Sequence, residues 1–258
     1  MKVIEVIKKF EENCPLNLQE DWDNSGVQID FSKEVLKGIV IGLDLSKELV
    51  DFAIEKNANF IFLHHPFFFE EIKSLDFYSN RGRILERLVE NRITVYSAHT
   101  NFDKVSFGVS NILAEKLGLK NNEVLFKEEN SKNGLGKKSE IEKISLFNMA
   151  EFVKDRLNLS SIVSYGDLNK EVEKVAVMGG SGAFAIDKCI DEKIDLLITG
   201  DIKYHDGQKA SENNLSILDI GHYNSEIDSI DFLFKYFSKF VEEEINIFKF
   251  DISKRKII

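Results

Sequence analysis

Cysteine and long apolar stretches are scarce in this chain of 258 residues. The two cysteines, Cys14 and Cys189, lie far apart and form no Cys-x-x-Cys pair. This excludes a disulfide scaffold and is typical of reduced thiols in a cytoplasm. No apolar stretch approaches the roughly 20 residues that a membrane helix needs, and charged residues interrupt any signal-like core at the N-terminus. We therefore expect a cytoplasmic protein with no membrane partner.

Positive charge is also in short supply, because 34 lysines and arginines face 44 acidic residues, for a net charge of -10. Such a surface repels a phosphate backbone unless its basic residues cluster, so nucleic acid is a disfavoured partner. With 43% hydrophobic and 30% charged residues, the chain has the composition of a globular protein. Its length suits one large domain or two medium domains with real cores.

Only five histidines are present, and two of them are adjacent. His64 and His65 directly follow the apolar run 60–63 and precede Pro66, which is typical of a buried strand that ends in a loop. Taken alone, the pair suits two solvated loop residues as well as ligands of two neighbouring metal centres. The other three histidines favour the second interpretation.

Each remaining histidine follows an apolar, strand-like run and has a carboxylate within four residues. Imidazoles and carboxylates are the ligands that borderline and hard divalent metals take, and acidic neighbours can also orient an imidazole. The pattern therefore predicts one shared metal site at the ends of strands. The pairs are His99 with Asp103, His205 with Asp206, and His222 with Glu226, the last one helical turn apart if a helix begins near Tyr223.

Apolar runs and helical spacing alternate along the chain, which predicts an α/β protein. We expect two interlinked α/β lobes with mixed or mostly parallel sheets, and a metal site at the carboxyl ends of strands between the lobes. A polar stretch at 120–143 suggests the boundary, giving lobes at 1–125 and 126–258, with the chain end able to pack back on the first lobe. The expected strands are 37–43, 59–63, 93–98, 172–178, 195–199, 215–220 and 245–250, and the expected helices include 46–56, 81–90, 109–117, 146–157, 183–190 and 230–240.

Three stretches allow two interpretations each. The loop around Trp22 is explained by turn chemistry or by a role in lining a pocket. The phenylalanines at 67–69 suit a core or interface better than a stacking platform, because no basic residues interleave them. The glycine-rich stretch 179–182 suits close packing better than anion binding at a helix start.

Six motifs, in order from about residue 3 to about residue 250, together resemble the GTP cyclohydrolase 1 type 2 homologue family. They are Trp22-Asp23-Asn24, Leu63-His64-His65-Pro66, Ala98-His99-Thr100-Asn101-Phe102-Asp103, Gly179-Gly180-Ser181-Gly182, Thr199-Gly200-Asp201 with Tyr204-His205-Asp206, and Gly221-His222-Tyr223 with Glu226. The resemblance implies a dinuclear metal protein that assembles into a toroidal homohexamer. The chain is similar to the short members, which lack a middle domain inserted near 120–135.

Carried over by position, the resemblance implies two divalent ions per chain, which would be zinc, iron, manganese or magnesium. His64 and His222 hold one ion, His65 and Asp103 hold the other, and Glu226 bridges both. The sequence departs from the family after Gly134-Leu135-Gly136, where many members have an arginine and this chain has Lys137. The ammonium of Lys137 cannot make the bidentate phosphate contact that an arginine makes. The resemblance therefore supports nucleotide specificity less strongly than it supports the metal site.

Two function classes stay open at this stage. One is a metal-dependent hydrolase of nucleotides or phosphoesters, which would cleave phosphoester bonds or C–N bonds of a purine ring. Two bridged ions suit the activation of water and the stabilisation of an oxyanion. The other is a non-catalytic, ring-shaped metal protein that interacts with other proteins. In a hydrolase, His99 and His205 are the expected proton carriers, because neither is needed as a ligand. Each equally suits the role of holding a ligand in place.

Overall fold

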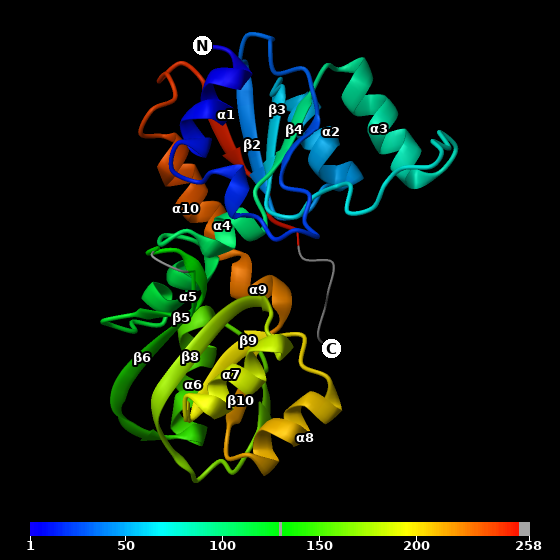
Figure 1. The fold of residues 1–258 in the computed structure, drawn as a ribbon. Helices are drawn as coiled ribbons and strands as arrows, with labels where there is room; N and C mark the ends of the chain where they lie inside the picture. Colours follow the sequence, from blue (N-terminus) through cyan, green and yellow to red (C-terminus); the bar gives the residue numbers. More distant parts are fainter. Residues whose placement is uncertain (129–130, 253–258) are drawn as a thin grey trace. The chain divides into compact units, whose positions relative to one another are not determined.

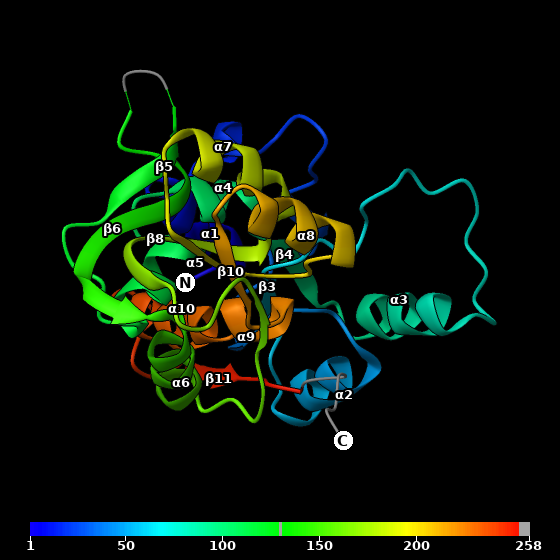
Figure 2. The same ribbon diagram turned by 90° about the horizontal axis from the view of Figure 1, so that it is seen from below.

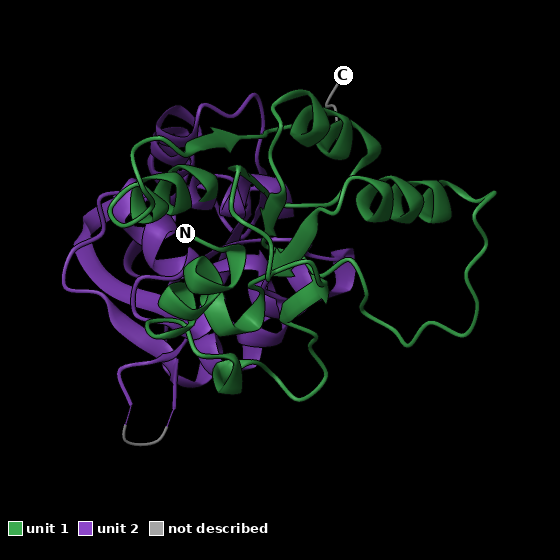
Figure 3. Cartoon of the chain, turned by 90° about the horizontal axis from the view of Figure 1, so that it is seen from above, with its two compact units in different colours: residues 1–102, 230–252 green, residues 103–229, 253–258 purple. Residues whose placement is uncertain are grey.

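The computed structural model describes residues 1–128 and 131–252, which divide into two compact units (Figure 3). Unit 1 comprises Met1–Phe102 and Ile230–Ile252, and unit 2 comprises Asp103–Ser229. Each unit is built on one sheet of mixed strand orientation with helices packed against it. This confirms the α/β class expected from the sequence. No helix in the described ranges is both long enough and apolar enough to cross a membrane.

Unit 1 contains a five-stranded sheet in the order β1-β4-β3-β2-β11 (Figure 1). Strand β1 is antiparallel to β4, and the other neighbours are parallel. The 66–79 segment leaves the sheet as a long loop that extends beside α3 (Figure 2). The elements are α1 (Val3–Glu11), η1 (Leu16–Leu18), β1 (Gly26–Ile29), β2 (Gly38–Gly42), α2 (Lys47–Glu55), β3 (Phe60–Leu63), α3 (Asn80–Glu90), β4 (Thr94–Ser97), most of α10 (Asp228–Phe237) and β11 (Asn246–Lys249).

The core of unit 1 lies on both faces of its sheet, because alternate residues of a strand point to opposite sides. On β3, Phe62 packs against Phe10 of α1 and Phe237 of α10, with ring centroids 4.9 Å and 5.0 Å away. Ile61 belongs to a separate buried cluster that includes Leu49 of α2 and residues of α3. With both faces covered, the strand reads as an unbroken apolar run in the sequence.

Unit 2 contains a six-stranded sheet in the order β5-β6-β8-β9-β10-β7. Strands β8, β9 and β10 run parallel, and β5, β6 and β7 pair antiparallel with their neighbours. The elements are the end of α4 (Thr100–Lys104), α5 (Val109–Lys116), β5 (Glu123–Lys127), β6 (Gly134–Ser145), α6 (Leu146–Leu157), β7 (Val163–Tyr165), β8 (Glu171–Ser181), η2 (Ala183–Ala185), α7 (Ile186–Asp191), β9 (Leu196–Gly200), α8 (Tyr204–Glu212), β10 (Ser216–Asp219) and α9 (His222–Glu226).

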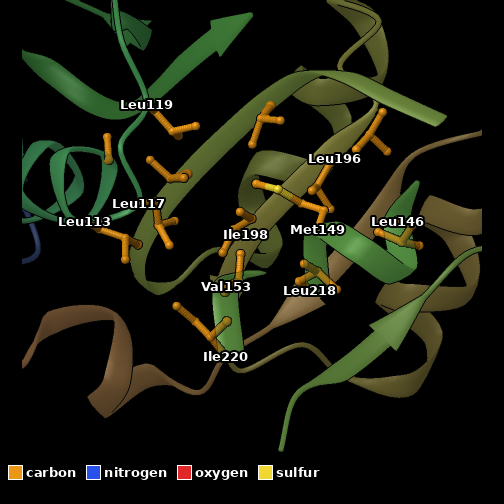
Figure 4. Close-up of a cluster of buried hydrophobic side chains, with 14 residues drawn as sticks. Leu113, Leu117, Leu119, Leu146, Met149, Val153, Leu196, Ile198, Leu218 and Ile220 are labelled. Carbon is orange, nitrogen blue, oxygen red and sulfur yellow. The ribbon is translucent and has the colours of Figure 1, made fainter. Parts of the chain in front are cut away.

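Two apolar clusters hold the helices of unit 2 against its sheet. One joins Leu113 of α5 and Met149 of α6 to Ile198 of β9 (Figure 4). The other joins Cys189 of α7 and residues of α8 to Leu197, the preceding residue of β9. Successive residues of β9 therefore serve opposite faces of the sheet, as strand geometry requires.

The polar stretch expected to be an exposed connection instead forms β5 and β6, which pair with each other, and β6 also pairs with β8. Antiparallel strands near a sheet edge can expose one face to water, so lysine and glutamate do not preclude them. The sequence places the boundary between the lobes at 125/126. In the structure, the chain passes from unit 1 to unit 2 after Phe102 and returns to unit 1 at Ile230. The returning segment includes β11, which pairs with β2.

Candidate metal centre

Three histidines of unit 1 follow two adjacent parallel strands. His64 and His65 come directly after β3, and His99 comes two residues after the end of β4. These strands are parallel, with Leu63 paired to Ser97, so their carboxyl ends meet at one edge of the sheet. The three imidazole rings lie 4.9 Å to 5.5 Å apart between centroids. We call these residues the histidine trio.

The Nδ1 atom of each imidazole in the trio is held by an oxygen. His64 Nδ1 lies 2.8 Å from the Ala98 carbonyl, and His65 Nδ1 lies 2.9 Å from Oδ1 of Asp44. His99 Nδ1 lies 2.8 Å from Oδ1 of Asp23. Carbonyl and carboxylate oxygens only accept hydrogen bonds, so each Nδ1 donates and the lone pair of the neutral ring resides on Nε2.

The trio has the spacing of a metal-binding group. One ring nitrogen from each of the three histidines lies within 4.8 Å of the others, and His64 is fully buried. A set of imidazoles whose other nitrogen donates to a carboxylate or carbonyl is the usual surrounding of a protein-bound divalent ion. The donor set and its hydrogen bonds therefore fit such an ion.

Asp23 is the most extensively bonded of these anchoring residues. Its side chain is fully buried and accepts hydrogen bonds from His99, from both the amide and the hydroxyl of Thr100, and from the Ser25 hydroxyl. Burial opposes ionisation, but the bonds from His99 and Thr100 outweigh it and hold the pKa of Asp23 well below its ordinary range. Asp23 is therefore a carboxylate that fixes the orientation of His99.

Aromatic side chains border His99. The rings of Trp22 and Phe69 lie 5.9 Å and 5.5 Å from the imidazole, between centroids, in edge-to-face arrangements. Phe67 and Phe68 differ from Phe69, because their rings lie 4.9 Å and 5.2 Å from the guanidinium of Arg81. The three consecutive phenylalanines thus have two different surroundings.

Unit 2 carries a second pair of candidate ligands. His222 and Glu226 are the first and last residues of α9, and His222 Nε2 lies 3.2 Å from Oε1 of Glu226. His222 Nδ1 lies 2.8 Å from Oδ2 of Asp201, which follows β9. This imidazole therefore repeats the anchoring seen in the trio. Glu226 is buried, with 3% of its surface exposed, so its carboxylate is a costly group unless it is paired or binds a cation.

Glycines allow the sheet of unit 2 to approach this pair closely. A Cβ atom at Gly180 would lie 2.7 Å from Oε1 of Glu226, and Gly180 has a φ of +70°. Its amide donates to the Ser225 hydroxyl at 2.8 Å. The glycine-rich stretch expected to open a helix therefore includes the end of β8, and close packing explains it.

Two predicted site residues, His205 and Asp103, are not members of these closely spaced groups. His205 lies on α8 and is exposed; its Nδ1 lies 3.5 Å from Oε1 of Gln208, and its ring contacts the ring of Tyr204. Asp103 lies on α4. Neither is among the closely spaced ligand atoms found in the described chain. Lys137, the departure from the family pattern, is buried on β6, and burial lowers the pKa of its ammonium while Glu115 partly opposes that change.

Sequence reasoning assigned no role to two of the anchoring aspartates. Asp44 follows β2 by two residues, and Asp201 directly follows β9. The available signal was their position after apolar strands, where polar groups gather in α/β sheets. The pairing of each aspartate with its histidine, 21 residues away in both cases, required the sheet register.

Comparison with known proteins identifies the family to which the chain is similar. The family model described as Duf34/NIF3 (NGG1p interacting factor 3) matches residues 1–256. A "GTP cyclohydrolase 1 type 2 homolog" of Clostridium perfringens is 34% identical over 228 residues, covering 88% of this chain and 87% of that protein. The homolog of the same name from Clostridium acetobutylicum is 31% identical over 233 residues, covering 89% and 87%.

Solved structures agree with the sequence comparison. The Bacillus cereus protein related to NIF3 has a TM-score of 0.93 at 24% identity, covering 100% of this chain and 99% of that one, which shows a shared fold. Reduced HcgD from Methanocaldococcus jannaschii has a TM-score of 0.84 at 29% identity, covering 98% of each chain. The resemblance drawn from six short motifs is thereby confirmed over nearly the whole length, and the chain belongs to the Duf34/NIF3 family.

Proposed function

We propose that this protein is a divalent-metal-dependent hydrolase that acts on a nucleotide or another phosphoester with two ions per chain. By resemblance, His64 and His222 hold one ion, His65 and Asp103 hold the other, and Glu226 bridges them. Bound ions would supply Lewis acidity, which lowers the pKa of water and stabilises a leaving oxyanion. The relatives named GTP cyclohydrolase 1 type 2 homolog support hydrolysis as the reaction class.

One observation carries the proposal: four imidazoles, three in unit 1 and one in unit 2, have Nδ1 engaged by an oxygen. An imidazole that served only to fill space would need no fixed tautomer. Fixing the proton on Nδ1 leaves the Nε2 lone pair aimed in one direction, which is what a metal ligand or a proton acceptor requires. The buried carboxylate of Glu226 adds the negative charge that two cations need.

His99 is the better placed of the two expected proton carriers. The Asp23 carboxylate holds its Nδ1, which leaves Nε2 as the atom that would exchange a proton with a substrate. His99 also belongs to the histidine trio, so metal binding is an equal alternative role for it. His205 is exposed and weakly held, which suits a residue that adjusts to a substrate.

The alternative function is a metal-containing interaction protein without turnover. The observation in its favour is the description of the family as an interacting factor. The two functions differ in one measurable property, since only the hydrolase converts a substrate when loaded with metal.

Metal content and turnover test the proposal together. We expect elemental analysis of a metal-loaded sample to find two ions per chain, and a screen of nucleotides and phosphoesters to find at least one substrate. Glu226→Gln should lower the occupancy of both sites, because the bridging charge is lost, whereas Asp103→Asn should lower mainly one. Glu243→Gln, at an exposed glutamate, is the control.

The outcomes separate the candidate functions. One ion or none per chain in wild-type protein would refute the dinuclear site. Two ions without turnover of any substrate would favour the interaction protein. In an active protein, His99→Gln and His205→Gln should reduce turnover at unchanged metal content if they carry protons, and metal loss would make the residue a ligand or an anchor instead.

A further inference from the structure

Two partly exposed aromatic rings border the histidine trio, and the proposed function does not use them. Trp22 is 63% exposed and Phe69 is 49% exposed, although both rings contact His99. Aromatic side chains supply much of the burial in protein cores and binding interfaces. Unit 1 therefore keeps aromatic surface accessible beside candidate metal ligands.

The contacts with His99 leave ring faces available. Trp22 and Phe69 meet the imidazole at interplanar angles of 74° and 90°. An edge-to-face contact covers at most one face of one of the two rings, so each aromatic residue keeps at least one face that His99 does not cover. A flat ligand ring can stack on such a face, and the stacking of a base on an aromatic side chain tolerates many ring types.

The loops that carry these rings are tied to each other. Asn24 Nδ2 donates to the Phe68 carbonyl at 2.6 Å, and the Phe68 amide donates to Oε1 of Gln28 at 3.1 Å. The Asp23 hydrogen bonds hold the residue that follows Trp22, and the Arg81 guanidinium lies over the ring that precedes Phe69. The two rings are therefore positioned by directed bonds on adjacent residues.

We propose that Trp22 and Phe69 form a subsite for a neutral nitrogen heteroaromatic ring, such as a purine base, carried by the ligand whose reacting group reaches the histidine trio. The residues beside the pair in sequence are acidic: Glu20 and Asp21 precede Trp22, and Glu70 and Glu71 follow Phe69. Carboxylates disfavour a phosphate at this end and accept hydrogen bonds from the N–H edge of such a ring. The subsite rests on the proposed function only in the expectation that the bound ligand is hydrolysed, because binding of the ring requires no turnover.

The protein contains its own probe, since Trp22 is its only tryptophan. We expect guanosine to quench the Trp22 fluorescence saturably, and ribose 5-phosphate, which lacks the ring, to leave it unchanged. Phe69→Ala retains the probe and should raise the dissociation constant for guanosine about fivefold or more, the lower end of the range for loss of a stacking partner. Phe147→Ala is the matched control, because Phe147 is 53% exposed and its ring contacts no histidine in the described chain.

The possible results separate the subsite from the hydrolase. Absence of quenching by guanosine, equal quenching by ribose 5-phosphate, or equal effects of Phe69→Ala and Phe147→Ala would overturn the subsite. Fluorescence that resists acrylamide would overturn it too, and would indicate that a second copy of the chain covers Trp22. Quenching by guanosine in a protein without turnover would sustain the subsite while the hydrolase proposal fails. Two bound ions and turnover without ring selectivity would sustain the hydrolase while the subsite fails.

Discussion

Each anchored imidazole depends on an oxygen that is distant in the chain. Asp23 reaches His99 across 76 residues, and Asp44 and Asp201 each reach their histidines across 21. The anchors act on the tautomer rather than on the ligand atom, so their loss changes which nitrogen carries the proton. Residues that never contact an ion thereby influence how well an ion is held.

Replacement of Asp23 by asparagine should expose this effect. The amide either presents a donor to His99 Nδ1 or turns and offers a weaker, uncharged acceptor, so we expect metal affinity to fall about 10- to 100-fold, as for other losses of such an anchor. Competition with a chelating dye measures this affinity. Asp21→Asn, at an exposed neighbouring aspartate, should have no such effect. In metal-free protein, nitrogen NMR should show the neutral His99 ring protonated at Nδ1 in the wild type and not uniformly so in the variant.

At the scale of secondary structure elements, the ends of strands determine what the site contains. The histidine trio follows strands β3 and β4, while Gly180 near the end of β8 and Gly200 at the end of β9 let these strands approach α9. A Cβ atom at Gly200 would lie 2.4 Å from the His222 amide nitrogen. The position of the candidate ligands thus requires glycine at residues 180 and 200.

Gly180→Ala tests this close approach. The side chain would collide with Glu226, and the positive φ of residue 180 adds strain of roughly 1–2 kcal/mol. We expect lower stability and reduced metal occupancy. Gly118→Ala is a matched control, because Gly118 has a φ of +73° but a Cβ atom there would lie 3.8 Å from its nearest neighbour, the Arg156 side chain. Equal metal occupancy in the two variants would contradict the role given to Gly180.

A second prediction at this scale concerns the joint between α7 and β6. Glu192 accepts from Lys138 at 2.7 Å and pairs with Lys188 at 2.7 Å, and these bonds hold its pKa below the ordinary value of 4.5. A lowered folded-state pKa contributes stability above the unfolded pKa, and this contribution is lost as pH falls through the folded pKa. Because solvent screens the pair, we expect Glu192→Gln to cost about 0.5–1 kcal/mol at neutral pH.

Urea denaturation at neutral pH and again below the folded pKa of Glu192 measures this contribution. The difference between the variant and the wild type should vanish in acid. Glu140→Gln provides a comparison on β6, the strand that carries Lys138. Glu140 is an exposed carboxylate for which the described structure records no ion pair. A difference that persists unchanged in acid would assign the effect to packing rather than to charge.

For the whole molecule, the resemblance to the family predicts a homohexamer. The 66–79 loop exposes Leu75 and Tyr78, which are 52% and 89% accessible, and such apolar surface is typical of a contact with another chain. Light scattering should therefore give a mass about six times the 29.6 kDa of one chain. Tyr78→Asp should lower this mass, whereas Asp21→Asn should not. A stable monomer at micromolar concentration would exclude the hexamer.

The alternation of strands and helices could be predicted from the amino-acid sequence, because burial periodicity and caps are local properties. Helix α6 has the expected bounds of 146–157, and Ser46 caps α2 by accepting from the Leu49 amide. The same local signals identified His64 and His65 at a strand end. These local signals did not identify β5 and β6. The two strands lack an apolar pattern of their own, and pairing with a neighbouring strand stabilises them.

The meeting of distant residues, in contrast, depends on the folded chain as a whole. The register of β3 with β4 brings His99 to His64, and the fold of the loop after Trp22 brings Asp23 to His99. The return of residues 230–252 to unit 1 likewise depends on the pairing of β11 with β2. Periodicity predicts that each segment has a buried face, but partner and register follow from the simultaneous packing of all segments.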